Sequence, residues 1–231
     1  KIFAKTDKVF LGITLSLVLI GVVIFISASL GILARNEQKF YGVVFNQILF
    51  GVVFGFSALI IMMNVNYMTF KKYAFHIMIL ALIMTSLVFI PGLSYEHGGA
   101  RRWLSIGSIQ FQPAEFLKIA FVIYFAAWLT WMKNKVHDFK KTLLPFAILV
   151  IIIAGILLRQ PDTKSLILIV VTGIAMCIVS GIPWKYIGGF LGISLLAFGI
   201  LAWTVPYLND RVQTFINPAK DSQGSGWQIN Q

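Results

Sequence analysis

The sequence predicts an all-α fold, a polytopic bundle of transmembrane helices. Hydrophobic residues make up 58% of the 231 residues and charged residues only 12%, whereas a soluble domain has about 25% charged residues. The mean hydropathy is +0.86, and long runs without charge alternate with short polar segments. Such a chain cannot bury all its apolar side chains in one core, so lipid must surround most of its surface.

Seven charge-poor runs are long enough, or nearly so, to cross the hydrocarbon layer, which takes about 20 residues. Backbone groups in lipid must be paired within a segment, and the alternation typical of a closed barrel is absent, so the runs are expected to be helices. The fourth run extends back to Pro113, which suits a first helical position. The first run is too long for a signal-peptide core and is expected to remain as a helix. The expected helices are residues 9–34, 40–70, 73–95, 113–132, 142–158, 165–184 and 186–209.

Small residues inside the runs suggest how the helices pack. Gly51 and Gly55, and likewise Gly188 and Gly192, have the four-residue spacing that lets helices approach closely. Cys177 lies inside an apolar run and is interpreted as a packing residue. A single cysteine excludes an intrachain disulfide and a cysteine-rich metal site.

The net charge of +11 comes largely from lysines in short clusters between apolar runs. This pattern favours attraction to anionic lipid headgroups over nucleic-acid binding. Because the lysine clusters contain few acidic residues, we expect them, and the N-terminus, on the cytoplasmic side. The other side then carries loops at 92–112, at 159–164 and from 209 onward. Residues 1–231 are expected to form a single integral membrane domain whose outer loop is incomplete at 209–231.

A first polar constellation surrounds the start of the fourth run: Arg101, Arg102, Gln112, Glu115 and Lys118. Glu115 and Lys118 are three residues apart and share a helix face. They could form a structural ion pair, with the arginines anchoring the membrane interface. Alternatively, the group could line a polar cavity that opens outward, in which Arg101, Arg102 and Lys118 hold an anion such as pyrophosphate.

Asp162 lies in a second constellation, between the fifth and sixth runs. It could cap the helix that follows, or face the same outer cavity as a base, a metal ligand or an orienting group. A third constellation, residues 211–218, reads by itself as a turn-rich loop. The sequence has no zinc-ligand spacing, no Walker loop and no Gly-x-Ser-x-Gly elbow.

The order and membrane positions of these segments resemble the SEDS family of bacterial cell-wall polymerases, which comprises FtsW, RodA and SpoVE. The resemblance covers the whole chain. An Ile-Pro-Gly segment at 90–92 favours the FtsW type over the RodA type. The matching motifs are Ser-Ala-Ser at 27–29, Gly-Ala-Arg-Arg-Trp-Leu at 99–104, Phe-Gln-Pro-Ala-Glu at 111–115 with Lys118, Gln-Pro-Asp at 160–162, and Arg211 with Asn-Pro at 217–218 and Gly-Trp-Gln at 226–228.

Two positions depart from the family pattern. Ala114 replaces a serine, and Lys164 stands where the family has glycine. Lysine accepts a positive φ poorly, so the backbone near Lys164 is expected to differ from the family's.

The resemblance implies a protein of ten helices, of which this chain would hold seven, stopping before the last three. It implies a peptidoglycan glycosyltransferase that polymerises lipid II into glycan strands, during cell division or elongation, at the outer face of the bacterial cytoplasmic membrane. Undecaprenyl pyrophosphate would be the leaving group, and the catalytic base would lie beyond Gln231, so the chain alone is expected to be inactive. The residues expected to bind substrate or shape the cavity are Arg101, Arg102, Gln112, Glu115, Lys118 and Asp162.

The resemblance also implies partners. These are a class B penicillin-binding transpeptidase, divisome or elongasome proteins, and membrane lipids, with no nucleic acid. A divalent cation, Mg²⁺ or Mn²⁺, suits a pyrophosphate leaving group, although the sequence shows no ligand set for it. Two other functions stay open: a flippase or transporter for a lipid-linked precursor, and an inactive scaffold fragment.

Overall fold

The computed structural model describes residues 7–33, 37–97, 100–106, 109–133 and 138–216. The chain divides into two compact units, Lys1–Thr69 and Phe70–Gln231.

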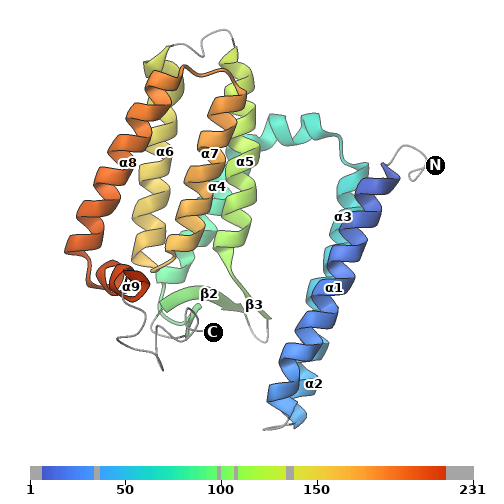
Figure 1. The fold of residues 1–231 in the computed structure, drawn as a ribbon. Coiled ribbons are helices and arrows are strands. Elements are labelled where there is room, and N and C mark those ends of the chain that lie inside the picture. The colour runs from blue at the N-terminus through green and yellow to red at the C-terminus, as the bar shows by residue number, and fades with distance from the viewer. Residues whose placement is uncertain (1–6, 34–36, 98–99, 107–108, 134–137, 217–231) are drawn as a thin grey trace. The chain divides into compact units, whose positions relative to one another are not determined.

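The first unit contains two membrane-spanning stretches. Helix α1 (Lys8–Leu33) begins after Asp7, whose carboxylate accepts hydrogen bonds from the N–H groups of Val9 and Phe10 at 2.9 and 3.1 Å. The second stretch contacts α1 through its first helix (Figure 1). It consists of α2 (Glu37–Asn46), a π-helical segment η2 (Gln47–Val53) and α3 (Phe54–Asn64).

The second unit is built from six α-helices: α4 (Tyr67–Ser86), which begins just before it, α5 (Pro113–Trp131), α6 (Phe139–Arg159), α7 (Thr163–Val179), α8 (Trp184–Thr204) and α9 (Pro206–Ile216). A short 3₁₀ turn, η3 (Leu87–Phe89), follows α4. Over the described ranges of both units, six helical stretches are long and apolar enough to span a membrane, and α7 is a shorter apolar helix of 17 residues. The expected polytopic helical membrane fold is therefore confirmed.

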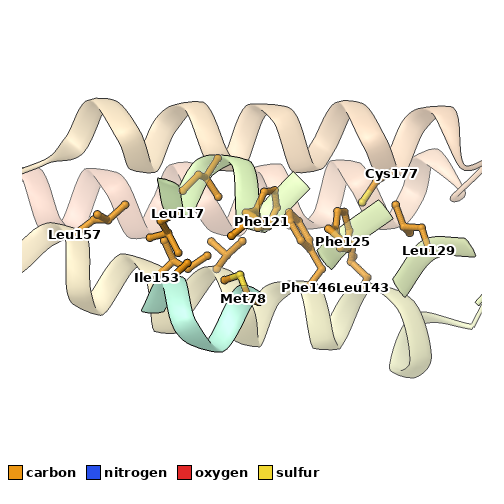
Figure 2. Close-up of a cluster of buried hydrophobic side chains, with 14 of the residues drawn as sticks. Met78, Leu117, Phe121, Phe125, Leu129, Leu143, Phe146, Ile153, Leu157 and Cys177 are labelled. Carbon is orange, nitrogen blue, oxygen red and sulfur yellow. The ribbon is translucent and has the colours of Figure 1, made fainter. Parts of the chain in front are cut away.

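Aromatic side chains from α5 and α6 form the centre of the core (Figure 2). The rings of Phe125 and Phe146 stack with centroids 4.8 Å apart, and Phe121 stacks on Phe125 at 5.6 Å. Helix α7 approaches this cluster at Gly173, where an added Cβ would lie 2.4 Å from a ring carbon of Phe146. Cys177 is buried in the same cluster, as predicted. Because lipid is as apolar as these side chains, close van der Waals packing is what stabilises such a core.

The glycine pairs predicted from spacing do not provide this close approach. A Cβ added at Gly55, Gly188 or Gly192 would have no atom within 4 Å among the described residues, and at Gly51 it would meet only the side chain of Gln47. Among the glycines that the structure describes, the tightest approach is at Gly173, where a large aromatic ring packs against the glycine.

The loop expected at 92–112 contains a small antiparallel sheet, which the prediction of an all-α chain missed. Its strands are β1 (Ser94–His97), β2 (Ala100–Ile106) and β3 (Ile109–Phe111), paired in the order β1-β2-β3. Leu104 of β2 is only 3% exposed and anchors the sheet on the helices. The chain enters the sheet through Gly92, whose φ of +89° suits a residue without a side chain.

The prediction of a turn-rich loop is wrong for residues 211–216, which belong to α9. The last run also breaks, because Pro206 disfavours helical geometry at Val205, which is extended with φ −99° and ψ 112°. Pro206 then occupies the first position of α9, which suits its missing N–H. Helix α9 buries Leu208 and leaves Phe215 exposed. Residues 217 and 218 lie outside the described residues.

The two ends of the second unit differ in chemistry. One end carries the sheet, α9 and the α6–α7 connection, and we call it the polar end (Figure 1). The opposite end, the lysine end, holds the α5–α6 and α7–α8 connections and the start of α4. There Asp138 caps α6, and a hydrogen bond from Lys141 holds the pKa of the Asp138 carboxyl below its usual value. The described lysines of this end are Lys71, Lys72, Lys133, Lys140, Lys141 and Lys185.

Candidate functional site

The connection between α6 and α7 is the centre of the polar end. The N–H of Asp162 donates to the carbonyl of Leu157 at 2.9 Å, which closes the last turn of α6. The residue before Asp162 in such a closure has positive φ and is usually glycine, as Gly181 is at the end of α7 (φ +79°). Here the residue is Pro161, with φ +31°. Proline has no backbone N–H to donate at this position.

Two side chains from distant segments hold the loop at its carbonyl groups. The guanidinium of Arg102, on β2, donates from Nε to the carbonyl of Gln160 at 3.0 Å and from Nη2 to that of Pro161 at 2.6 Å. The hydroxyl of Tyr207, on α9, donates to the same Pro161 carbonyl at 2.7 Å. The loop is thus fixed from both the sheet and α9.

Asp162 is a buried helix cap, as one of its two predicted roles required. It is 4% exposed. One carboxylate oxygen accepts from the N–H of Ser165 at 3.3 Å, and the other accepts from Ser165 Oγ at 2.8 Å and from Gln112 Nε2 at 3.0 Å. Because three donors surround the carboxylate of this nearly buried residue, the geometry suits a structural group more than a base.

Gln160 extends the polar network into the helix bundle. It is 1% exposed, and its Nε2 donates to the carbonyl of Thr85 on α4 at 2.6 Å. Its Oε1 and the hydroxyl of Thr163 are buried without a hydrogen-bond partner among the described residues. Buried polar atoms are rarely left unpaired, so these two atoms have capacity for a bridging water.

Glu115 and Lys118 form the ion pair that their spacing predicts, with Lys118 Nζ 2.8 Å from Glu115 Oε1. The Glu115 side chain is 63% exposed and that of Lys118 is 22% exposed. Lys118 also lines a hollow of about 310 Å³ between α5 and α7, whose other lining residues are Ile119, Phe121, Val122, Ile123, Leu168, Ile169 and Thr172. Arg101 is exposed on β2.

The predicted site residues therefore fall into three groups. Arg102, Gln112 and Asp162 belong to one hydrogen-bonded network around the α6–α7 connection. Glu115 and Lys118 form a separate pair, and Arg101 is an exposed residue of β2. Whether these residues bind substrate stays a prediction.

The sequence did not predict a role for Tyr207. It also predicted the unusual backbone conformation of the α6–α7 connection at the wrong residue. Tyr207 falls inside the apolar run at 186–209, and the only signal that it starts a new helix is Pro206. Lys164, where positive φ was expected to be difficult, lies in the first turn of α7, and Pro161 carries the positive φ instead.

The described residues do not fit a resident metal site. They include no group of three or more His, Cys, Asp or Glu side chains placed to hold a metal ion. Asp162 is already surrounded by donors and Glu115 is paired with Lys118. The expected divalent cation stays a prediction.

Comparison with known proteins identifies the family. The model of the FtsW/RodA/SpoVE family, described as "Cell cycle protein", matches residues 7–231. The chain belongs to this family. The SEDS membership expected from the motifs at 99–118 and 160–162 is therefore confirmed.

Curated relatives of this SEDS protein carry FtsW or SpoVE names. A Trichlorobacter lovleyi protein named "Probable peptidoglycan glycosyltransferase FtsW" is 30% identical over 170 residues, covering 72% of this chain and 44% of the relative. Stage V sporulation protein E of Bacillus subtilis is 32% identical over 169 residues, covering 73% and 46%. The chain thus spans about half the length of these relatives.

Two solved structures share the fold. One, titled as the structural coordination of polymerization and crosslinking by a peptidoglycan synthase complex, has a TM-score of 0.66 at 23% identity and covers 90% of this chain and 62% of that one. The rod shape determining protein RodA of Thermus thermophilus has a TM-score of 0.57 at 23% identity, covering 76% and 58%. These matches support the SEDS fold.

Removing the Asp162 carboxylate is expected to destabilise this SEDS protein. Asp162→Ala deletes the cap of α7 and leaves the half-buried Gln112 amide and the buried Ser165 hydroxyl without their acceptor. We expect the free energy of unfolding to fall by about 2–4 kcal/mol, the sum of a lost cap and unpaired buried donors. Asp162→Asn keeps a capping oxygen, so its free energy of unfolding should fall by less than half as much as that of Asp162→Ala. SDS-induced unfolding in detergent measures both, and an Ala variant as stable as the wild type would contradict the assigned contacts.

Proposed function

We propose that the full-length protein is a peptidoglycan glycosyltransferase that polymerises lipid II at the outer face of the bacterial cytoplasmic membrane. Family membership across residues 7–231 carries the proposal, and relatives of this family bear that enzyme name. In the proposed reaction, an acceptor sugar hydroxyl attacks the anomeric carbon of the donor and undecaprenyl pyrophosphate leaves. The expectation that the base taking the hydroxyl proton lies beyond Gln231 stays a prediction, as does the inactivity of this chain alone.

The polar end of the second unit supports this proposal, because a pyrophosphate leaving group needs nearby cations. Lys118 and Arg101 are the proposed anion-binding residues. Arg102 already uses two of its N–H donors on the α6–α7 connection, so we assign it mainly to holding that loop. Lys118 also borders a mostly apolar hollow, a combination that suits a lipid chain with an anionic headgroup.

The proposed orientation places the lysine end in the cytoplasm. Its described connections carry clustered lysines with Asp138 as their acidic neighbour, whereas the basic residues of the polar end lie near Glu115, Asp162 and Asp210. Basic residues concentrate in cytoplasmic loops, so the polar end faces outward, as lipid II polymerisation requires. A cytoplasmic N-terminus stays a prediction from the sequence.

We also propose a crosslinking partner, a class B penicillin-binding transpeptidase acting with divisome or elongasome proteins. Support comes from the synthase complex with the shared fold, whose title couples polymerization with crosslinking. The segment at 90–92 favours a role in division over elongation.

The decisive test is lipid II polymerisation by purified full-length protein without another synthase, with glycan strands resolved by length. A parallel assay of the same protein measures translocation of a fluorescent lipid II analogue in proteoliposomes. Glycan strands would support the polymerase. Translocation without strands would move the assignment to a flippase, and neither activity, even with the transpeptidase present, would support a scaffold.

A further inference from the structure

We propose that Tyr207 is a positioning residue that ties α9 to the α6–α7 connection and thereby fixes Asp162 and the substrate-binding polar end. The inference rests on the proposed function only in taking a lipid-linked anionic sugar as the substrate of that end.

Tyr207 and Arg102 donate hydrogen bonds to the same atom. The Tyr207 hydroxyl and Arg102 Nη2 both donate to the Pro161 carbonyl, at 2.7 and 2.6 Å. A carbonyl oxygen has two lone pairs, so both are used. Arg102 and Tyr207 lie 59 and 46 residues from Pro161 along the chain, so this atom joins three separate segments.

The Pro161 carbonyl and the N–H of Asp162 belong to one peptide bond. Because a peptide unit is planar, fixing the Pro161 oxygen also fixes the N–H of Asp162 in the same plane. That N–H donates to Leu157, and the Asp162 carboxylate must stay within reach of Gln112. A rotation of this plane would disturb both contacts, so the Tyr207 hydroxyl acts on Asp162 without touching it.

Tyr207 is itself held in place by its neighbours on α9. The next residue, Leu208, is 2% exposed and anchors the first turn of α9. The guanidinium of Arg211, one turn later, lies 4.7 Å from the centre of the Tyr207 ring. A displacement of α9 would therefore be transmitted through this hydrogen bond to the loop at Pro161.

The test compares Tyr207→Phe with wild type in the full-length protein, using amide hydrogen exchange. The variant removes one oxygen and keeps the ring. A neutral hydrogen bond shifts an equilibrium by about 3- to 10-fold, so exchange within 159–166 should accelerate by about that factor, while the core of α5 stays unchanged. The matched control is Tyr186→Phe, since the Tyr186 hydroxyl has no hydrogen-bond partner in the described part of the chain and its ring packs on Phe139.

A kinetic measurement separates positioning from general loss of structure. In lipid II polymerisation, Tyr207→Phe should raise KM by about 3- to 10-fold and change kcat by less than about twofold, because the hydroxyl orients the binding end. Partial unfolding would instead lower kcat at constant KM.

The outcomes are distinct. Unchanged exchange at 159–166, or equal acceleration in Tyr186→Phe, overturns the tie between α9 and the loop. Faster exchange with wild-type KM overturns the positioning role. A wild type that makes no glycan contradicts the proposed function. The hydrogen-exchange comparison of the two variants then still tests whether Tyr207 holds α9 to the α6–α7 connection.

Discussion

Arg102→Ala is expected to lower lipid II polymerisation by the full-length protein by about 100-fold or more. The variant removes two hydrogen bonds from a charged donor to the Gln160 and Pro161 carbonyls. Each such bond contributes about 1.5–3 kcal/mol, and the loop conformation at Pro161 depends on them. Glycan yield per folded protein measures the effect, with folding checked by the thermal midpoint in detergent.

Two matched variants make the Arg102 result specific. Arg159→Ala removes another arginine at the same end, whose side chain has no hydrogen bond or ion pair with any residue in the described ranges, and should stay within about twofold of wild type. Arg102→Lys keeps the charge but loses the forked donor geometry, so it should recover little activity. Wild-type glycan yield from Arg102→Ala would contradict the role assigned to the loop.

Gly173→Ala is expected to destabilise the second unit by about 1–3 kcal/mol, the usual cost of overpacking a tight core. The new Cβ would lie 2.4 and 2.7 Å from two carbons of the Phe146 ring and 3.1 Å from Phe121. Phe146 cannot withdraw easily, since it is 1% exposed and stacked on Phe125. The free energy of SDS-induced unfolding measures the loss.

Gly155→Ala on α6 is the matched control for Gly173→Ala. A Cβ there meets no atom within 4 Å in the described residues, and alanine is the better helix former by up to about 1 kcal/mol. Gly155→Ala should therefore be neutral or stabilising. Equal stability of the two variants would show that α7 does not pack on Phe146 as described.

Most of the long helices were predictable from sequence because they depend on a local property, the length of a charge-poor run. The break at Val65 between α3 and α4, and helix α9, were not predicted. Pro113 begins α5 as predicted, and Glu115 pairs with Lys118, since residues three apart on a helix are neighbours. The sheet was not predicted, because its pairing of Tyr95 with Trp103 depends on contacts between strands rather than on a periodic signal.

The residue types of the candidate site were predictable from the sequence, but their hydrogen-bond partners were predictable only in part. The sequence placed Arg102 and Asp162 at the same end, but not the two carbonyl groups that Arg102 binds. Backbone acceptors are identical in every residue, so no side-chain pattern identifies Gln160 and Pro161 as the targets. Tyr207 was not predicted either, because its acceptor is also a backbone carbonyl. In addition, the helix break at Pro206 lies inside an apolar run.

The distribution of photo-cross-links from a substrate analogue tests the central claim, that the polar end binds the lipid-linked sugar. Full-length protein would be irradiated with lipid II carrying a photoreactive group next to its pyrophosphate, digested, and mapped by mass spectrometry, with an excess of unmodified lipid II as the competitor. We predict competed labels within 101–118 and 159–165, weakened in Arg102→Ala. Competed labels confined to the lysine end, around 71–72, 138–141 and 185, would contradict the account.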